Sequence, residues 1–207
     1  SRGSMLVSRV VDPRPGERVL DLCAAPGGKT AHLAALMEDS GRVVAVECHR
    51  DRARALERNC QRMRATCVRV EVADATDGRS PELFDRVLVD PPCSGLGTLQ
   101  ARPDLRWRAS PESIAELAGL QAAILDAAAA AVVPGGWLTY SVCTISAQES
   151  ESVLGAFVAE HPEFVADDLG EMHPQWRHHR QAHFLQLLPH RDGTDGFFLA
   201  RLRRRAL

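Results

Sequence analysis

Short runs rich in β-branched residues alternate with helical segments over most of the chain, and this alternation constrains the fold more than any other feature. The runs at residues 18–22, 43–47, 67–72, 84–90 and 137–141 are predicted strands. The segments between them predict helices, because they carry apolar residues at helical spacing or begin with capping residues. Strands that alternate with helices form a mainly parallel sheet covered on both faces. The sequence therefore predicts an α/β fold.

Three connecting segments carry specific helix signals. One apolar stripe has helical spacing and consists of Ala53, Leu56, Cys60 and Met63. Ser110 and Pro111 predict an N-cap followed by a first-turn proline, opening a helix that Pro134-Gly-Gly136 ends. Ser146 and Glu149 have the spacing of a capping box. The helix behind it is expected to bury Val153, Leu154, Phe157 and Val158.

The last quarter of the chain follows a different pattern. Residues 183–188 and 197–202 predict two strands, and residues 192–196 supply a glycine-containing turn between them. Two strands joined in this way form an antiparallel hairpin. A mainly parallel seven-stranded sheet that ends in such a hairpin is the outline of the class I, Rossmann-like methyltransferases. We therefore expect residues 1–207 to form one domain of that kind.

The composition limits where the protein acts and what it binds. A net charge of −2 over 207 residues gives no general nucleic-acid signal, so any RNA contact must come from a local patch. The six cysteines contain no C-x-x-C pair, which predicts free thiols in a reducing compartment. We expect a cytoplasmic protein, since no signal peptide and no membrane-spanning run is found. The histidines lack the spacing of a metal site, so no metal is expected.

The segment Asp21-Leu-Cys-Ala-Ala-Pro-Gly-Gly-Lys-Thr30 joins the first strand to its helix. It is not a P-loop, because Cys23 stands where that motif needs glycine, and it lacks the dehydrogenase glycine spacing. Its small residues would still let a ligand lie against the backbone.

Acidic residues at the ends of the next strands extend this candidate site. Glu47 could accept hydrogen bonds from both ribose hydroxyls, Asp74 could accept one from an adenine amino group, and Asp90 follows the fourth strand. A set of carboxylates suits a nucleoside with a positive sulfonium, S-adenosylmethionine, better than a polyphosphate. The alternative is that strand-end acids are only solvated caps.

Two cysteines follow neighbouring strands, Cys93 in Asp90-Pro-Pro-Cys-Ser-Gly95 and Cys143 in Thr139-Tyr-Ser-Val-Cys-Thr144. Carbon 5 of cytosine is a poor nucleophile, and a thiolate that adds to carbon 6 activates it. Methylation of that carbon needs one cysteine, and a second thiol can act as base or assist release. On chemistry alone, Cys93 and Cys143 are nearly equal candidates for the nucleophile.

The three motifs together resemble those of the Nol/Nop/Sun RNA cytosine-5 methyltransferases. Residues 102–107 and 195–198 resemble the bacterial Sun (Fmu) branch, which modifies 16S rRNA, and the likeness covers about residues 4–203. It implies that Cys143 is the nucleophile and that Cys93 assists product release, with Lys29 and Asp90 in the catalytic site. The cofactor positions that it implies are Cys23, Ala24, Ala25, Pro26, Gly27, Gly28, Lys29, Glu47, Asp74 and Asp90.

RNA contact is predicted at the loop after Cys93, where Arg102, Arg106 and Arg108 surround Trp107. Cations beside an aromatic ring can hold phosphates and stack a base. A solvated loop with a packed tryptophan explains these residues equally well. Family members carry RNA-binding segments upstream, so we expect this chain to be the catalytic domain. The alternatives are a tRNA cytosine-5 methyltransferase and a cofactor-binding RNA scaffold, although two pocket thiols argue against a scaffold.

Overall fold

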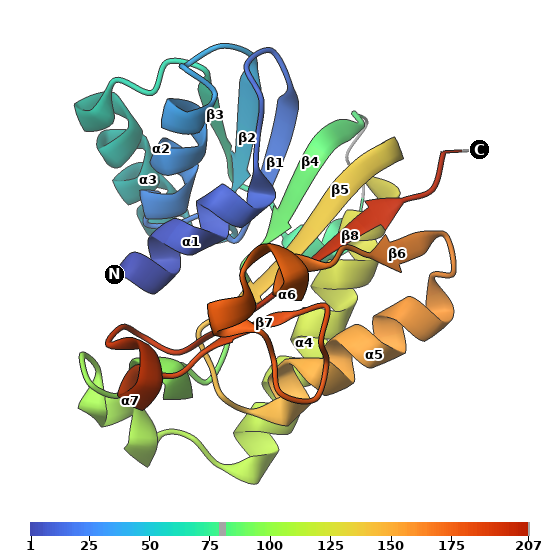
Figure 1. Cartoon of the computed structure of the whole chain (residues 1–207). Coiled ribbons are helices and arrows are strands. Elements are labelled where there is room, and N and C mark those ends of the chain that lie inside the picture. Colours follow the sequence, from blue (N-terminus) through green and yellow to red (C-terminus); the bar gives the residue numbers. More distant parts are fainter. Residues whose placement is uncertain (79–81, 207) are drawn as a thin grey trace.

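The computed structural model of the protein describes residues 1–78 and 82–206, which share one central sheet (Figure 1). The strand order is β3-β2-β1-β4-β5-β8-β6, and β7 pairs with β8. The strands are β1 (Arg18–Leu22), β2 (Arg42–Val46), β3 (Val68–Glu71), β4 (Phe84–Val89), β5 (Val132–Val142), β6 (Phe164–Ala166), β7 (Leu185–Leu187) and β8 (Phe197–Arg204). All five predicted strands of the parallel part are present.

The sheet is parallel from β1 to β5, and its C-terminal strands are antiparallel. The predicted hairpin is confirmed, with Leu185 of β7 opposite Leu199 of β8. The expected number of seven strands is wrong by one, since the described residues form eight. The last position of the sheet is shared, because β7 and β6 pair with opposite ends of β8. With three residues, β6 is too short for its alternation to be recognised in the sequence.

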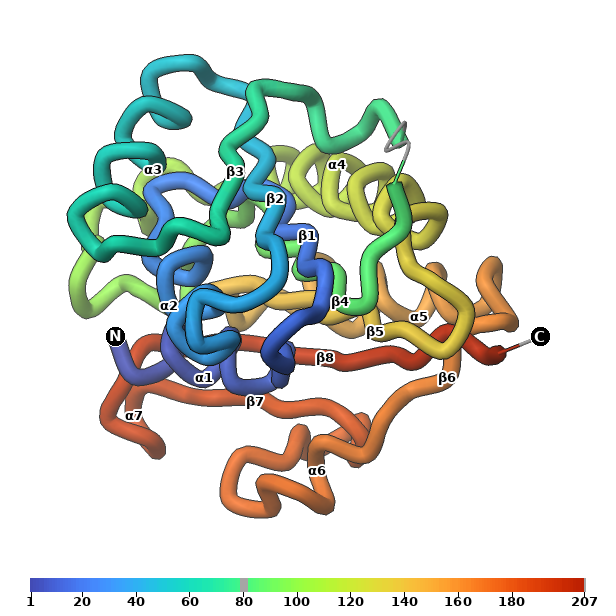
Figure 2. Tube along the Cα trace, turned by 90° about the horizontal axis from the view of Figure 1, so that it is seen from above, coloured from blue at the N-terminus to red at the C-terminus, as the bar shows by residue number. Residues whose placement is uncertain are grey.

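Helices cover both faces of the sheet (Figure 2). One face is covered by α1 (Arg2–Val11), α2 (Gly28–Leu36) and α3 (Arg50–Met63). The other face is covered by α4 (Pro111–Ala130) and α5 (Glu151–Glu160). Successive strand side chains point to opposite faces, so Val19 packs with α1 and Leu20 with α4. The short helices are α6 (Leu169–Met172), α7 (Pro189–Asp192), η1 (Ala75–Asp77), η2 (Leu96–Thr98), η3 (Pro103–Trp107), η4 (Ala147–Glu149) and η5 (Pro174–Trp176).

Most of the helix signals hold, with two differences. The stripe of α3 is buried except at Met63, which is 55% exposed because the helix ends at that residue. The Ser110 side chain caps α4 as predicted, by accepting a hydrogen bond from Ser113. The helix ends at Ala130, before the predicted stop at 134–136. Those residues lie in β5, where its register with β4 is irregular.

The alanine-rich helix α4 is long and apolar enough to cross a membrane by length and composition alone. The prediction that no run in the chain has this property is therefore wrong. One such helix is weak evidence for a membrane span, because core helices have the same composition. Ile124 and Leu125 place one face of α4 in the core against the sheet, so we interpret it as a covering helix.

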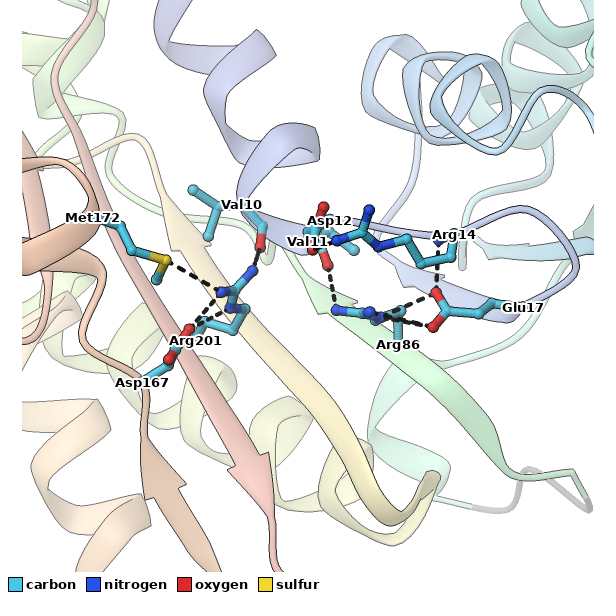
Figure 3. Close-up of polar contacts among 9 residues, drawn as sticks. All are labelled: Val10, Val11, Asp12, Arg14, Glu17, Arg86, Asp167, Met172 and Arg201. Atoms are coloured by element: carbon cyan, nitrogen blue, oxygen red, sulfur yellow. Dashed lines mark hydrogen bonds and ion pairs between the residues drawn. The ribbon is translucent and has the colours of Figure 1, made fainter.

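Two buried arginines fasten α1 to the sheet (Figure 3). Arg201 of β8 donates a 2.7 Å hydrogen bond to the carbonyl of Val10, and Arg86 of β4 donates one of 3.2 Å to the carbonyl of Val11. Their carboxylate partners are Asp167 and Glu17 respectively. Cations are favourable where the carbonyls of a helix C-terminus lack partners within the helix. The pairs thus fix the end of α1.

Candidate active site

The predicted site residues gather at the carboxyl edge of the parallel sheet. Strand β1 leads into Cys23, β2 into Glu47, β4 into Asp90 and β5 into Cys143. Parallel strands end at the same edge, which explains why residues so far apart in the sequence meet. A cavity of about 690 Å³ opens there. The predicted residues that line it are Cys23, Ala25, Glu47, Asp74, Asp90, Cys93 and Cys143.

The turn after β1 depends on unusual backbone angles. Cys23 has φ 63° and Gly27 has φ 98°, both in the left-handed region. Gly27 disfavours any side chain for two reasons. Its φ is positive, and a Cβ there would lie 2.6 Å from Cδ1 of Leu56. Glycine therefore lets the turn pack against α3 and directs the chain into α2.

Only part of this turn faces the large cavity. Cys23 and Ala25 line it, whereas Gly27 and Gly28 line a separate cavity of about 430 Å³ beside α1 and α3. The remaining turn residues are held through their backbone. Ala24 N donates to the Val46 carbonyl at 2.9 Å, and Asn59 donates to the Pro26 carbonyl at 2.6 Å.

The two candidate nucleoside-binding acids have different surroundings. Glu47 is 2% exposed, and its Oε1 accepts a 3.0 Å hydrogen bond from the backbone of His49. Its Oε2 lies 3.5 Å from the Arg52 guanidinium. Asp74 is exposed, and its Oδ1 accepts hydrogen bonds from the backbone and hydroxyl of Thr76. Glu47 is thus a buried carboxylate in the cavity wall, and Asp74 is a more weakly enclosed one.

The two thiols lie in contact, with 3.3 Å between Cys93 Sγ and Cys143 Sγ. Beside them Lys29 Nζ forms a 2.6 Å ion pair with Asp90 Oδ2, and both of these side chains are largely buried. The structure thus brings together all four predicted catalytic residues. All six cysteines of the chain are free thiols, as the sequence predicts.

The surroundings make the two thiols chemically unequal. A hydrogen bond from Cys93, with the positive charge of Lys29, lowers the pKa of Cys143 below that of an ordinary thiol. The hydrogen bond to Cys143, together with burial, raises the pKa of Cys93 well above that value. The arrangement therefore favours a Cys143 thiolate that accepts a hydrogen bond from a protonated Cys93.

A buried carboxyl beneath the site titrates near neutrality. Burial raises the pKa of Asp21 to about 7, although the hydroxyl of Thr30 donates a 2.7 Å hydrogen bond to it. Its Oδ1 has no hydrogen-bond partner among the described residues. At pH 7 Asp21 carries only part of a charge, so Asp90 is the main anionic partner of Lys29.

Glu149 has a role that the sequence did not reveal. The predicted capping box is wrong, because the Ser146 side chain makes no cap and α5 begins only at Glu151. The Glu149 carboxylate instead accepts hydrogen bonds from Ser94 and Thr144, the residues after the two cysteines. Its spacing from Ser146 concealed this role, since the same spacing is typical of a helix start.

Part of the predicted RNA-contact loop lines the cavity. Arg102 lines the cavity, while Trp107 is 80% exposed, with the Arg106 guanidinium 4.6 Å from its ring centroid. Arg108 and Arg102 pair with Asp104. The alternative of a packed tryptophan is therefore wrong, and an exposed ring with a stacked cation stands beside the thiols' cavity.

The observed donors and acceptors fit S-adenosylmethionine. The buried Glu47 carboxylate has two oxygens for a vicinal diol, and the open turn at Cys23 and Ala25 lets a ligand approach the backbone. A cavity of about 690 Å³ lies within the usual range for small-molecule sites. Asp90 lines the same cavity as Glu47 and both thiols.

The comparisons with known proteins agree with this geometry. The profile of the family described as 16S rRNA methyltransferase RsmB/F matches residues 8–203. The chain is 41% identical over 207 residues to the probable ribosomal RNA small subunit methyltransferase B of Bacillus subtilis, covering 98% of this chain and 46% of that protein. It is 40% identical over 201 residues to ribosomal RNA small subunit methyltransferase B of Thermus thermophilus, covering 97% and 48%.

The chain therefore spans about half the length of the curated relatives that it matches. Among solved structures, NSun6 from Pyrococcus horikoshii with SFG has a TM-score of 0.90 and 30% identity, covering 98% of this chain and 51% of that one. A SAM-dependent O-methyltransferase from Thermotoga maritima has a TM-score of 0.64 at 16% identity, and the match covers 100% of this chain and 66% of that one. This likeness shows the fold alone. The chain has the predicted class I methyltransferase fold and belongs to the RsmB/F family of 16S rRNA methyltransferases.

Proposed function

We propose that this chain is the catalytic domain of an enzyme that methylates carbon 5 of a cytidine in small-subunit rRNA. The family is one of S-adenosylmethionine-dependent rRNA methyltransferases. The observation that carries the finer proposal is the contact between Cys93 and Cys143, 3.3 Å apart beside the Lys29–Asp90 ion pair. Two adjacent thiols match a reaction in which one adds to the base and the other assists release. Free thiols also support a cytoplasmic location.

In this proposal Glu47 binds the ribose and Asp74 the adenine amino group, while Cys23 and Ala25 of the turn after β1 border the remainder of S-adenosylmethionine. Bound there, the cofactor supplies an electrophilic methyl group. NSun6, a structural neighbour of this chain, was solved with SFG, an analogue of that cofactor. Asp90 supplies negative charge close to the position that a sulfonium would take.

The Cys143 thiolate would add to carbon 6 of the cytosine, and the electron pair that moves to carbon 5 would form the new bond to the methyl carbon, whose bond to the cofactor sulfur breaks. To finish, a base takes the carbon 5 proton, and the electrons of that bond re-form the ring double bond and expel the Cys143 thiolate. Cys93 is suited to this second half once it has passed its own proton to solvent, because its raised pKa makes its thiolate the more basic of the two. Lys29 stabilises negative charge near Cys143 and is itself held by Asp90.

The RNA strand enters, in this proposal, past the loop that carries Trp107. An aromatic ring that is 80% exposed offers a stacking surface, and the neighbouring arginines offer contacts to phosphates. These residues lie beside a cavity that contains both thiols. An RNA held there would present a flipped cytidine to Cys143.

The product tests this function directly. The protein is incubated with S-adenosylmethionine and unmodified small-subunit rRNA, and the nucleosides are then identified by mass spectrometry. We expect 5-methylcytidine at one or a few positions, and none with the Cys143→Ala variant. The matched control is Cys67→Ala, which removes a half-buried thiol that packs against the α1–α2 side of the sheet. A methyl group on an exocyclic amine or a ribose would contradict the proposal, and methylation of tRNA alone would move it to that substrate.

A further inference from the structure

One buried carboxylate connects the two loops that carry the cysteines. Glu149 is 0% exposed and accepts a 2.7 Å hydrogen bond from the backbone N–H of Ser94 and another from its hydroxyl. It also accepts one of 3.0 Å from the Thr144 hydroxyl and one of 3.1 Å from the Gln121 amide. A carboxylate can accept about four hydrogen bonds, so every acceptor position of Glu149 is occupied by a donor of the protein.

The donors are placed where they control the thiols. Ser94 directly follows Cys93, and Thr144 directly follows Cys143. The two hydroxyls also contact one another at 2.9 Å. A shift of Glu149 would therefore move both cysteines' loops, whose sulfurs come from segments 50 residues apart in the sequence.

The Glu149 backbone is fixed as well. The buried hydroxyl of Tyr140 shares its one proton between the Glu149 carbonyl at 2.7 Å and the amide oxygen of Gln121 at 3.1 Å. Gln121 in turn donates to the Pro92 carbonyl at 2.9 Å, one residue before Cys93. Fully satisfied buried networks of this kind hold one geometry.

We propose that Glu149 is a positioning residue that keeps Cys93 and Cys143 in hydrogen-bonding contact for the proposed reaction. The inference rests on the proposed roles of the two thiols. Glu149 does not line the cavity, so it acts through Ser94 and Thr144. An acceptor-only group is required, because every group that surrounds the carboxylate donates.

The decisive variant is Glu149→Gln, which keeps the shape and turns an amide N–H₂ toward donors. We expect kcat to fall roughly 100-fold, as for a small misplacement of reacting groups, while KM for S-adenosylmethionine stays unchanged. The pH profile of Cys143 alkylation by iodoacetamide, followed by mass spectrometry, supplies a second reading. Loss of the Cys93 hydrogen bond should move it toward higher pH, where ordinary thiols react.

Two further variants complete the design. Glu151→Gln, two residues along, is the matched control, since Glu151 pairs with His178 and Arg180 and not with the cysteine loops. It should leave both readings unchanged. Ser94→Ala removes one donor to Glu149 and should shift kcat and the alkylation profile in the same direction, but by less. It tests the positioning role if Glu149→Gln does not fold.

The positioning role would be overturned if folded Glu149→Gln kept both its kcat and its alkylation profile. If Glu149→Gln does not fold, the same result in Ser94→Ala would overturn it. The same holds if Glu151→Gln shifts both readings equally. Failure of the proposed function looks different, because Cys143→Ala would then retain full methyl transfer. In that case the alkylation profile alone still tests whether Glu149 sets the contact between the two thiols.

Discussion

At the scale of single residues, Glu47 combines burial with incomplete pairing. Its Oε1 accepts hydrogen bonds from the His49 backbone and the Cys48 thiol, and its Oε2 meets a guanidinium only at 3.5 Å. A buried carboxylate costs free energy unless hydrogen bonds compensate it. Glu47 lies in the wall of the large cavity, where a ligand with two hydroxyls would donate the missing hydrogen bonds and compensate this cost.

Replacing Glu47 by alanine should weaken binding of S-adenosylmethionine by roughly 2–3 kcal/mol, as expected for lost hydrogen bonds to a charged acceptor. Calorimetric titration measures this change. The control is Glu57→Ala, at an exposed position on α3 away from the cavity lining. A dissociation constant for Glu47→Ala equal to that of the control would remove Glu47 from the ribose-binding role.

Residue types and motif order predicted which side chains would meet, but not the role of Glu149. Cys93 and Cys143 could be brought together from sequence because each follows a strand of one parallel sheet. Glu149 belongs to a local S-x-x-E spacing that normally begins a helix. Only the tertiary structure shows that donors from Ser94 and Thr144 surround it instead.

At the scale of elements, the attachment of α1 depends on side chains from distant strands. Arg201 of β8 joins the Val10 carbonyl to the Asp167 carboxylate, and Trp137 packs over its guanidinium with 4.8 Å to the ring centroid. This contact could not be predicted from the sequence, because its members are far apart along the chain.

The variant Arg201→Met should lower the free energy of unfolding by about 2–3 kcal/mol, somewhat less than the loss typical of a fully buried ion pair. It leaves Asp167 without its cation and the Val10 carbonyl without its arginine donor. Urea denaturation measures the loss, and Arg203→Met is the control because Arg203 is exposed and only neighbours Trp137. Equal stability of the two variants would show that Arg201 does not anchor α1.

At the scale of the whole molecule, strand–helix alternation was enough to predict the parallel sheet, its covering helices and the edge that carries the site. The shared last position of the sheet could not be predicted, since β6 and β7 have three residues each and their pairing depends on the length of β8. The common edge of β1, β2, β4 and β5 places Glu47, Asp90 and both thiols around one cavity. We propose that methyl transfer through a covalent adduct takes place in this cavity.

Trapping of the adduct between protein and RNA tests that claim most directly. Cys93→Ala, incubated with S-adenosylmethionine and small-subunit rRNA, should attack and then stall, leaving a complex that survives denaturing gel electrophoresis. Cys143→Ala should give neither the complex nor methylated RNA, and Cys67→Ala should behave as the unmodified protein. We expect a trapped complex in Cys93→Ala only. A complex trapped in Cys143→Ala but absent from Cys93→Ala would contradict the assignment of Cys143 as the nucleophile.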